Sequence, residues 1–131
     1  MQQHSLVSAC VLSAFLAIGC AADLPRHSAL LTPASAQDPA GVIQFTSSVK
    51  VKPPSLYSST IPAGSAWQLA GRLPEGEVYR PIRGTVFALE SANVHEAFLV
   101  IDGSSLVGAY LPVERAFVTV QRVDNLPLLQ K

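Results

Sequence analysis

The side chains that could carry acid–base or metal chemistry are few and widely spaced in this 131-residue chain. His27 and His95 lie 68 positions apart, which does not provide the closely spaced ligands of a metal site. Glu96 follows His95 directly, but adjacent residues of a strand point to opposite faces, so the two do not form a catalytic dyad. We therefore expect a non-enzymatic protein without metal or cofactor, and interpret His95 as a polar strand residue.

A second group of polar side chains is the stretch Tyr79-Arg80-Pro81-Ile82-Arg83, which places a phenol and two guanidinium groups close together. Guanidinium groups pair well with carboxylates, and tyrosine and arginine are common anchors of protein interfaces. Tyr79, Arg80 and Arg83 are therefore candidate partner-binding residues. A solvated loop without a partner is the alternative interpretation of the same stretch.

The charged residues are balanced, with nine basic and nine acidic side chains and a formal net charge of zero. Nucleic-acid binding requires a basic face, which this balance does not favour. The chain length corresponds to one domain. We therefore expect no nucleic-acid partner.

The N-terminal 22 residues contain no Lys, Arg, Asp or Glu, and residues 6–18 form the apolar run LVSACVLSAFLAI. A transmembrane helix needs about 20 such residues, whereas the centre of a secretory signal has about 7–15. A buried helix would show a polar stripe, which is not evident here. Residues 1–19 are therefore predicted to be a signal peptide.

The stretch Leu16-Ala17-Ile18-Gly19-Cys20 resembles the lipobox of bacterial lipoproteins, with a small residue directly before the cysteine. The resemblance implies that Cys20 receives a diacylglyceryl group, that the chain is cut before Cys20, and that the new amine is acylated by a fatty acid such as palmitate. In Gram-negative lipoproteins an aspartate directly after the cysteine signals inner-membrane retention. This chain has Ala21 there, so the resemblance implies the periplasmic face of the outer membrane.

Two other fates of Cys20 are weaker alternatives. A Cys10–Cys20 disulfide would use both cysteines of the chain, but both lie in or beside the segment that is removed. Cleavage by an ordinary signal peptidase could follow Ala22, which places Cys20 at an unusual position. Cleavage after the stretch Ala34-Ser35-Ala36 would lie far from the apolar run.

The composition changes after the cysteine, where Pro25, Pro33 and Pro39 interrupt a stretch of small and polar residues. This stretch has no sustained period of 3.6 or 2, so residues 20–40 are predicted to be a flexible tether. Twenty such residues would reach roughly 60 Å when fully extended. A tether of this kind would hold a domain away from the membrane.

Residues 41–123 are predicted to form a small all-β domain of about five strands, either a barrel or a two-layer sheet. The clearest element is a hairpin, in which apolar strands at 94–101 and 106–111 flank a loop that begins Asp102-Gly103. Phe98 and Val100 should be buried there, and Gly108 should mark a bend or bulge. Residues 124–131 are predicted to be a frayed tail.

The predicted layout favours an accessory or structural lipoprotein of a cell-envelope assembly, such as a secretion or conjugation complex, with a protein partner in the envelope. The alternative is a periplasmic binding or inhibitor module that recognises a peptidoglycan fragment or a hydrolase. This expectation rests on likeness of layout alone.

Overall fold

The described part of the chain is all-β. The computed structural model describes residues 23–35, 41–55 and 57–129, and these contain no helix. The prediction of an all-β fold is confirmed, but the strands are more numerous than the five expected. They are β1 (His27–Ser28), β2 (Thr32–Pro33), β3 (Val42–Gln44), β4 (Val49–Val51), β5 (Ser59–Ile61), β6 (Ala66–Leu73), β7 (Gly76–Ile82), β8 (Ala88–Glu90), β9 (Val94–Glu96), β10 (Phe98–Asp102), β11 (Ser105–Leu111) and β12 (Ala116–Val123).

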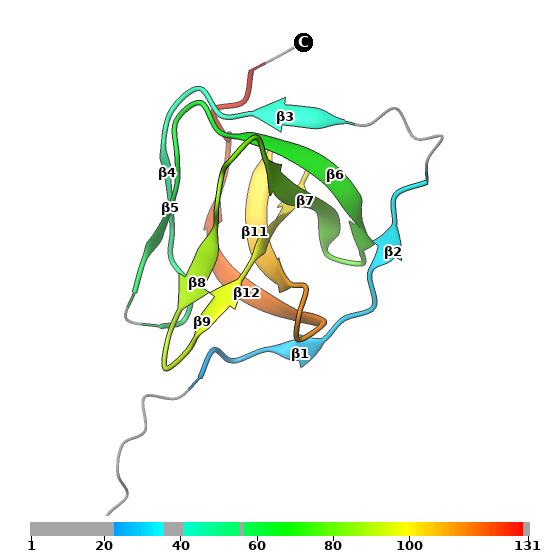
Figure 1. Cartoon of the computed structure of the whole chain (residues 1–131), viewed down its shortest axis with the longest axis vertical. Coiled ribbons are helices and arrows are strands. Elements are labelled where there is room, and N and C mark those ends of the chain that lie inside the picture. The colour runs from blue at the N-terminus through cyan, green and yellow to red at the C-terminus, as the bar shows by residue number, and fades with distance from the viewer. Residues whose placement is uncertain (1–22, 36–40, 56, 130–131) are drawn as a thin grey trace, which may run out of the picture.

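Eight of these strands form one antiparallel sheet that curls into a half-barrel (Figure 1). Its strand order is β1-β12-β11-β10-β7-β6-β2, and β3 also pairs with β6. Two small sheets, β4–β5 and β8–β9, complete the structure. Three of the pairs in the main sheet are hairpins of consecutive strands, in which short turns connect β6 to β7, β10 to β11 and β11 to β12.

The predicted central hairpin is present as β10 and β11, with Asp102 opposite Ser105 and Gly103 at a φ of 64° in the turn. The apolar stretch before the turn is not one strand, because β9 pairs with β8 and ends at Glu96. Val100 is fully buried as expected, whereas Phe98 is only half-buried. Gly108 lies at an irregularity in register with both neighbouring strands, which confirms the predicted bulge.

Two hydrophobic clusters stabilise the sheet, one on each of its faces. The larger fills the half-barrel, where the fully buried Trp67 packs edge-on against Phe45 and Phe87. The smaller lies on the other face, and its buried members are Leu73, Val78, Val100, Tyr110 and Phe117. A sheet with apolar residues on both faces needs a cover on each side.

The segment expected to be a tether supplies part of that cover. Residues 23–35 do not extend away from the domain, because β1 pairs with β12 and β2 pairs with β6. Leu24 is buried in the larger cluster, while Ala29 and Leu31 pack against the smaller one. This N-terminal segment (residues 23–35) therefore belongs to the folded domain and bridges both edges of the sheet. The prediction that the domain begins at residue 41 is corrected accordingly.

The C-terminal residues are also packed, as far as the structure describes them. Leu126 is buried, Leu128 forms a β-bridge with Phe45, and the Thr46 amide donates to the Pro127 carbonyl. The expected frayed tail therefore contributes to the core up to Leu128.

Candidate functional site

The predicted lipidation site, Cys20, lies outside the described residues. Asp23, three positions after Cys20, is the first residue that the structure describes. The side chain of Asp23 is hydrogen-bonded to the buried His95 and to Ser91, and this group is a candidate site.

Asp23, His95 and Glu114 form a group that we name the histidine cluster. Nε2 of His95 lies 2.7 Å from Oδ1 of Asp23, and Nδ1 lies 2.7 Å from Oε1 of Glu114. The three residues come from the N-terminal segment, β9 and the β11–β12 turn. His95 is 5% exposed, and its two carboxylate partners are 72 and 19 residues away in sequence. Strand alternation turns His95 inward between the exposed Val94 and Glu96.

The charges of the histidine cluster stabilise one another. The Arg26 guanidinium, His95 and the Ser91 hydroxyl hold the pKa of Asp23 well below its ordinary value. Burial alone would lower the pKa of His95, but its hydrogen bonds to Asp23 and Glu114 outweigh burial and raise it. Burial opposes ionisation of Glu114, yet its bond to His95 lowers that pKa overall. Because ionised carboxylates can only accept, contacts with two of them favour donation by both ring nitrogens of His95, that is, the imidazolium form.

This arrangement is suited to fastening segments together and is unlike a nucleophilic triad. In a triad a serine hydroxyl contacts the histidine, whose other nitrogen contacts a carboxylate. Here the Ser91 hydroxyl donates to Oδ1 of Asp23 at 2.8 Å, the same oxygen that binds His95. An imidazolium bonded on both sides has no lone pair to accept a proton from a substrate.

Of the three candidate partner-binding residues, Arg80 and Arg83 are exposed, whereas Tyr79 is buried. Tyr79 lies within β7 and is 8% exposed, so it is a core residue and does not belong to a surface loop. Its hydroxyl donates to Oε2 of Glu77 at 2.8 Å, and burial together with Glu77 raises the pKa of Tyr79 to about 12. Arg80 is exposed on the opposite face of the strand and donates to Oε1 of Gln68.

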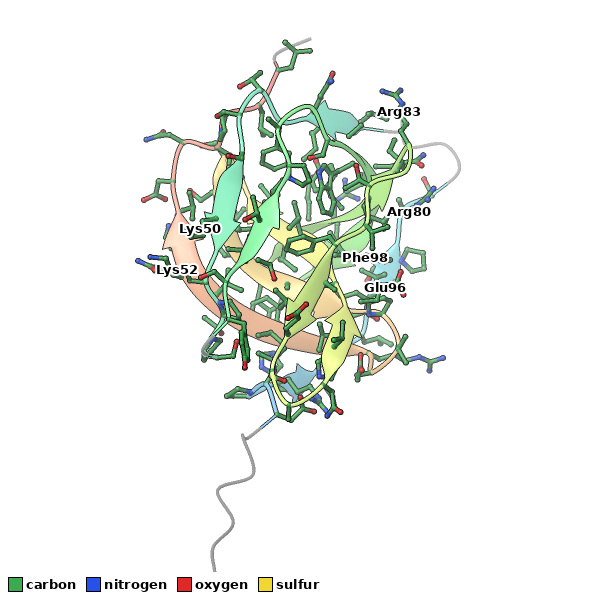
Figure 2. The ribbon with its side chains drawn as sticks, turned by 60° about the vertical axis from the view of Figure 1, so that its left-hand side comes forward. Lys50, Lys52, Arg80, Arg83, Glu96 and Phe98 are labelled. Atoms are coloured by element: carbon green, nitrogen blue, oxygen red, sulfur yellow. The ribbon has the colours of Figure 1, made fainter. Side chains whose placement is uncertain are left out.

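Arg83 occupies a tight turn directly after β7. Arg83 and Gly84 both have positive φ, at 56° and 80°, and the Thr85 amide donates to the Ile82 carbonyl. Positive φ at both central residues is typical of a type I′ turn, in which asparagine and glycine are favoured. Figure 2 shows Arg80, Arg83 and Glu96 along one side of the molecule, and Lys50 and Lys52 on the other.

An open, mostly apolar hollow lies beside this turn, between the end of β7 and the β8–β9 hairpin. We name it the valine groove, and its volume is about 440 Å³. Its lining residues are Pro81, Thr85, Val86, Phe87, Ala88, Val94 and Glu96. Val86 is 87% exposed and Val94 is 69% exposed, and both line this hollow. Among the described residues that line it, Glu96 carries the one charged side chain.

No family model, curated protein or solved structure matches this chain. The residues themselves must therefore indicate the function. Within residues 23–35, 41–55 and 57–129, no group of three or more His, Cys, Asp or Glu side chains is arranged to hold a metal ion. In the same ranges, no helix is long and apolar enough to cross a membrane.

Sequence reasoning did not find the histidine cluster or the valine groove. The separation of His95 from Glu96 is confirmed, but the two partners of His95 are distant in sequence, and one of them, Asp23, belongs to the segment expected to be a tether. A buried histidine must find polar partners, so the alternation of β9 was the one signal available. The sequence does not mark Val86 and Val94 as exposed, because a pattern of apolar residues does not show which face remains uncovered.

Proposed function

We propose that this protein is a lipid-anchored, non-enzymatic lipoprotein on the periplasmic face of the bacterial outer membrane, where its β domain binds a protein partner in an envelope assembly. The anchor part of the proposal depends on the lipobox resemblance that ends in Cys20. The proposal that the domain binds a protein partner depends on the valine groove, which is the main observation that supports it.

The groove has the properties of a small protein-binding surface. Apolar side chains form its centre, while Glu96 lines it and Arg83 occupies the adjoining turn. Apolar centres with charged rims are typical of interfaces between proteins, and the exposed valines would lose contact with water on binding. Arg80 and Arg83 can pair with carboxylates of the partner.

The second candidate is a binding or inhibitor module for a peptidoglycan fragment or a hydrolase. The volume of the groove is within the range of small-molecule sites, which favours it as an alternative. A small ligand, however, is usually enclosed, and the two exposed valines of the groove, Val86 and Val94, suit a larger partner better.

The anchor is tested by mass spectrometry of the protein purified from membranes. We expect a mature chain that begins at Cys20 and carries a diacylglyceryl group, and unprocessed precursor for Cys20→Ser. A mature chain beginning at residue 23 or 37 would contradict the anchor. Fractionation with inner-membrane markers would contradict the outer-membrane location.

The partner surface is tested by photo-crosslinking in intact cells. A photoreactive amino acid is placed at Val86 or Val94, and at Leu30 as a control that is equally apolar and 89% exposed. We expect a discrete protein adduct from both groove positions and none from Leu30, and Arg83→Ala should weaken the adduct. Groove positions that yield no protein adduct, with the lipid present on Cys20, would exclude the groove as the partner surface.

A further inference from the structure

The histidine cluster determines how far the domain can lie from position 20. Cys20 precedes Asp23 by three positions, and three residues span at most about 11 Å when fully extended. Asp23 is itself bound by Arg26 at 2.7 Å, by Ser91 at 2.8 Å and by His95 at 2.7 Å. Leu24, the next residue, is 3% exposed. A lipid on Cys20 is therefore held close to one end of the domain.

Three segments meet at this end, which we name the anchor-side end: residues 23–26, the β8–β9 turn at 91–93 and the β11–β12 turn at 112–115. Figure 1 shows the start of the described chain, the tip of the β8–β9 hairpin and β1 together, with the C-terminus at the opposite end. Hydrogen bonds of Asp23 to Ser91 and His95, and of His95 to Glu114, join the three segments.

The exposed side chains of the anchor-side end suit a lipid surface. Val113, at the β11–β12 turn, is 75% exposed and can enter the boundary between headgroups and acyl chains. Arg115 is exposed two positions later, and its guanidinium can pair with phosphate groups. Asp23 and Glu114 are neutralised by Arg26 and His95, so these two carboxylates do not repel the headgroups.

We propose that the anchor-side end lies directly on the phospholipid surface that holds the acyl chains of Cys20, fastened there by the histidine cluster. The domain is then seated against the membrane, whereas a tether of twenty residues would let it move away. This inference rests on the lipidation of Cys20 proposed above. Its consequence is that the valine groove is presented beside the bilayer, within reach of partners that are themselves bound to the membrane.

The experiment uses single cysteines as positions for a fluorescent label. In the lipidated protein the thiol of Cys20 is blocked, so an introduced cysteine is the reactive one. Val113→Cys and Asn93→Cys place the label at the anchor-side end. The matched control is Ser47→Cys, an exposed position next to Thr46, whose amide donates to the Pro127 carbonyl near the C-terminus. The C-terminus lies at the opposite end from β1 (Figure 1). The full-length proteins are purified from membranes and reconstituted into phosphatidylethanolamine–phosphatidylglycerol vesicles that contain a headgroup-bound quencher.

Labels at positions 93 and 113 should be quenched at least about twofold more strongly than the label at position 47, because only the former are at headgroup depth. Adding Asp23→Ala should reduce this contrast while circular dichroism still shows the β domain. Equal quenching at positions 113 and 47 in lipidated protein would overturn the inference and leave the anchor intact. An unreduced contrast with Asp23→Ala would overturn the role of the cluster. Absence of the lipid by mass spectrometry would overturn the anchor, and the inference with it.

Discussion

His95 is a buried cation whose charge is matched only while both carboxylate partners stay in place. Each partner belongs to a different segment, so the imidazolium joins the N-terminal segment and the β11–β12 turn to the β8–β9 hairpin. Buried charges are costly without partners, and for that reason removal of one member affects the others.

Replacing His95 by glutamine should therefore destabilise the domain. We expect His95→Gln to lower the free energy of unfolding by roughly 1–3 kcal/mol, because two carboxylates lose a charged donor. Urea unfolding measures the change, with His27→Gln as the control. His27 is 61% exposed and lies 3.3 Å from Glu75, so its replacement should change stability by less than about 0.5 kcal/mol. Equal effects of the two variants would contradict the assignment of His95 as the central residue of the cluster.

The stability that His95 contributes should depend on pH. Because folding raises its pKa, the contribution is complete below the ordinary value of 6.5 and is lost as pH rises through the raised value. Asp23 and Glu114 act in the opposite sense, since their lowered pKa values make their contribution complete above the ordinary 3.8 and 4.5. The difference in unfolding free energy between the protein and His95→Gln should be largest at about pH 5–6 and should decrease above about pH 7. A difference that increases with pH would show that His95 is neutral in the folded state.

A substitution at Arg83 can affect the stability of the domain and the binding of a partner differently. A non-glycine residue at positive φ is strained by about 1 kcal/mol, and asparagine tolerates this conformation better. We expect Arg83→Asn to leave the urea midpoint unchanged or to raise it slightly, while weakening the cross-linked adduct at the valine groove. A variant that loses the adduct together with its stability would instead point to a structural role.

At the scale of elements, Gly108 determines how closely β11 approaches β12. A Cβ atom at this position would lie 2.4 Å from the ring of Phe117 and 2.7 Å from the Val118 carbonyl oxygen. The Phe117 ring also contacts His27, with centroids 5.2 Å apart, so a displaced ring would disturb the pairing of β1.

Gly108→Ala should therefore destabilise the domain by about 1–3 kcal/mol, the usual cost of overpacking a filled site. Gly41→Ala is the matched control, because a Cβ there would meet Leu69 at an ordinary distance of 4.0 Å. Thermal unfolding of both variants measures the effect. No difference between them would mean that Phe117 can move without cost.

Elements formed by local interactions were predictable from the sequence, while those formed by distant pairing were not. The β10–β11 hairpin was evident, because its strands and its Asp102-Gly103 turn are adjacent in the chain. The pairing of β1 with β12 joins residues about ninety positions apart, and two-residue strands rich in proline and serine carry no periodic pattern. Arg80 and Arg83 could be identified as surface residues from their residue types alone. The histidine cluster could not be predicted, because its members are distant in sequence and meet only in the folded chain.

At the scale of the whole molecule, the domain includes its N-terminal segment. A chain that begins at Gly41 would lose Leu24 from the larger cluster, Ala29 and Leu31 from the smaller one, and Asp23 from His95. Burial of apolar surface is the main favourable term in folding, so these losses combine.

We therefore expect a chain of residues 41–131 to unfold at a clearly lower urea concentration than a chain of residues 23–131. The shorter chain should also bind an apolar dye, because the smaller cluster is uncovered. Equal midpoints for the two chains would show that the segment adds no stability and would restore the tether interpretation.

The N-terminal segment also has a consequence for self-association. A β-sheet with free edges offers unpaired amide and carbonyl groups to the strands of other molecules. In this sheet β1 pairs with β12 at one edge and β2 pairs with β6 at the other, so the same short stretch of chain protects both edges. Release of that stretch would free the edge of β12 and also the part of β6 around Gly71 and Arg72 that β3 does not cover. Edge pairing of molecules with one free edge stops at a dimer, whereas molecules with two free edges can continue to add neighbours, so we expect loss of the segment to favour open-ended polymers.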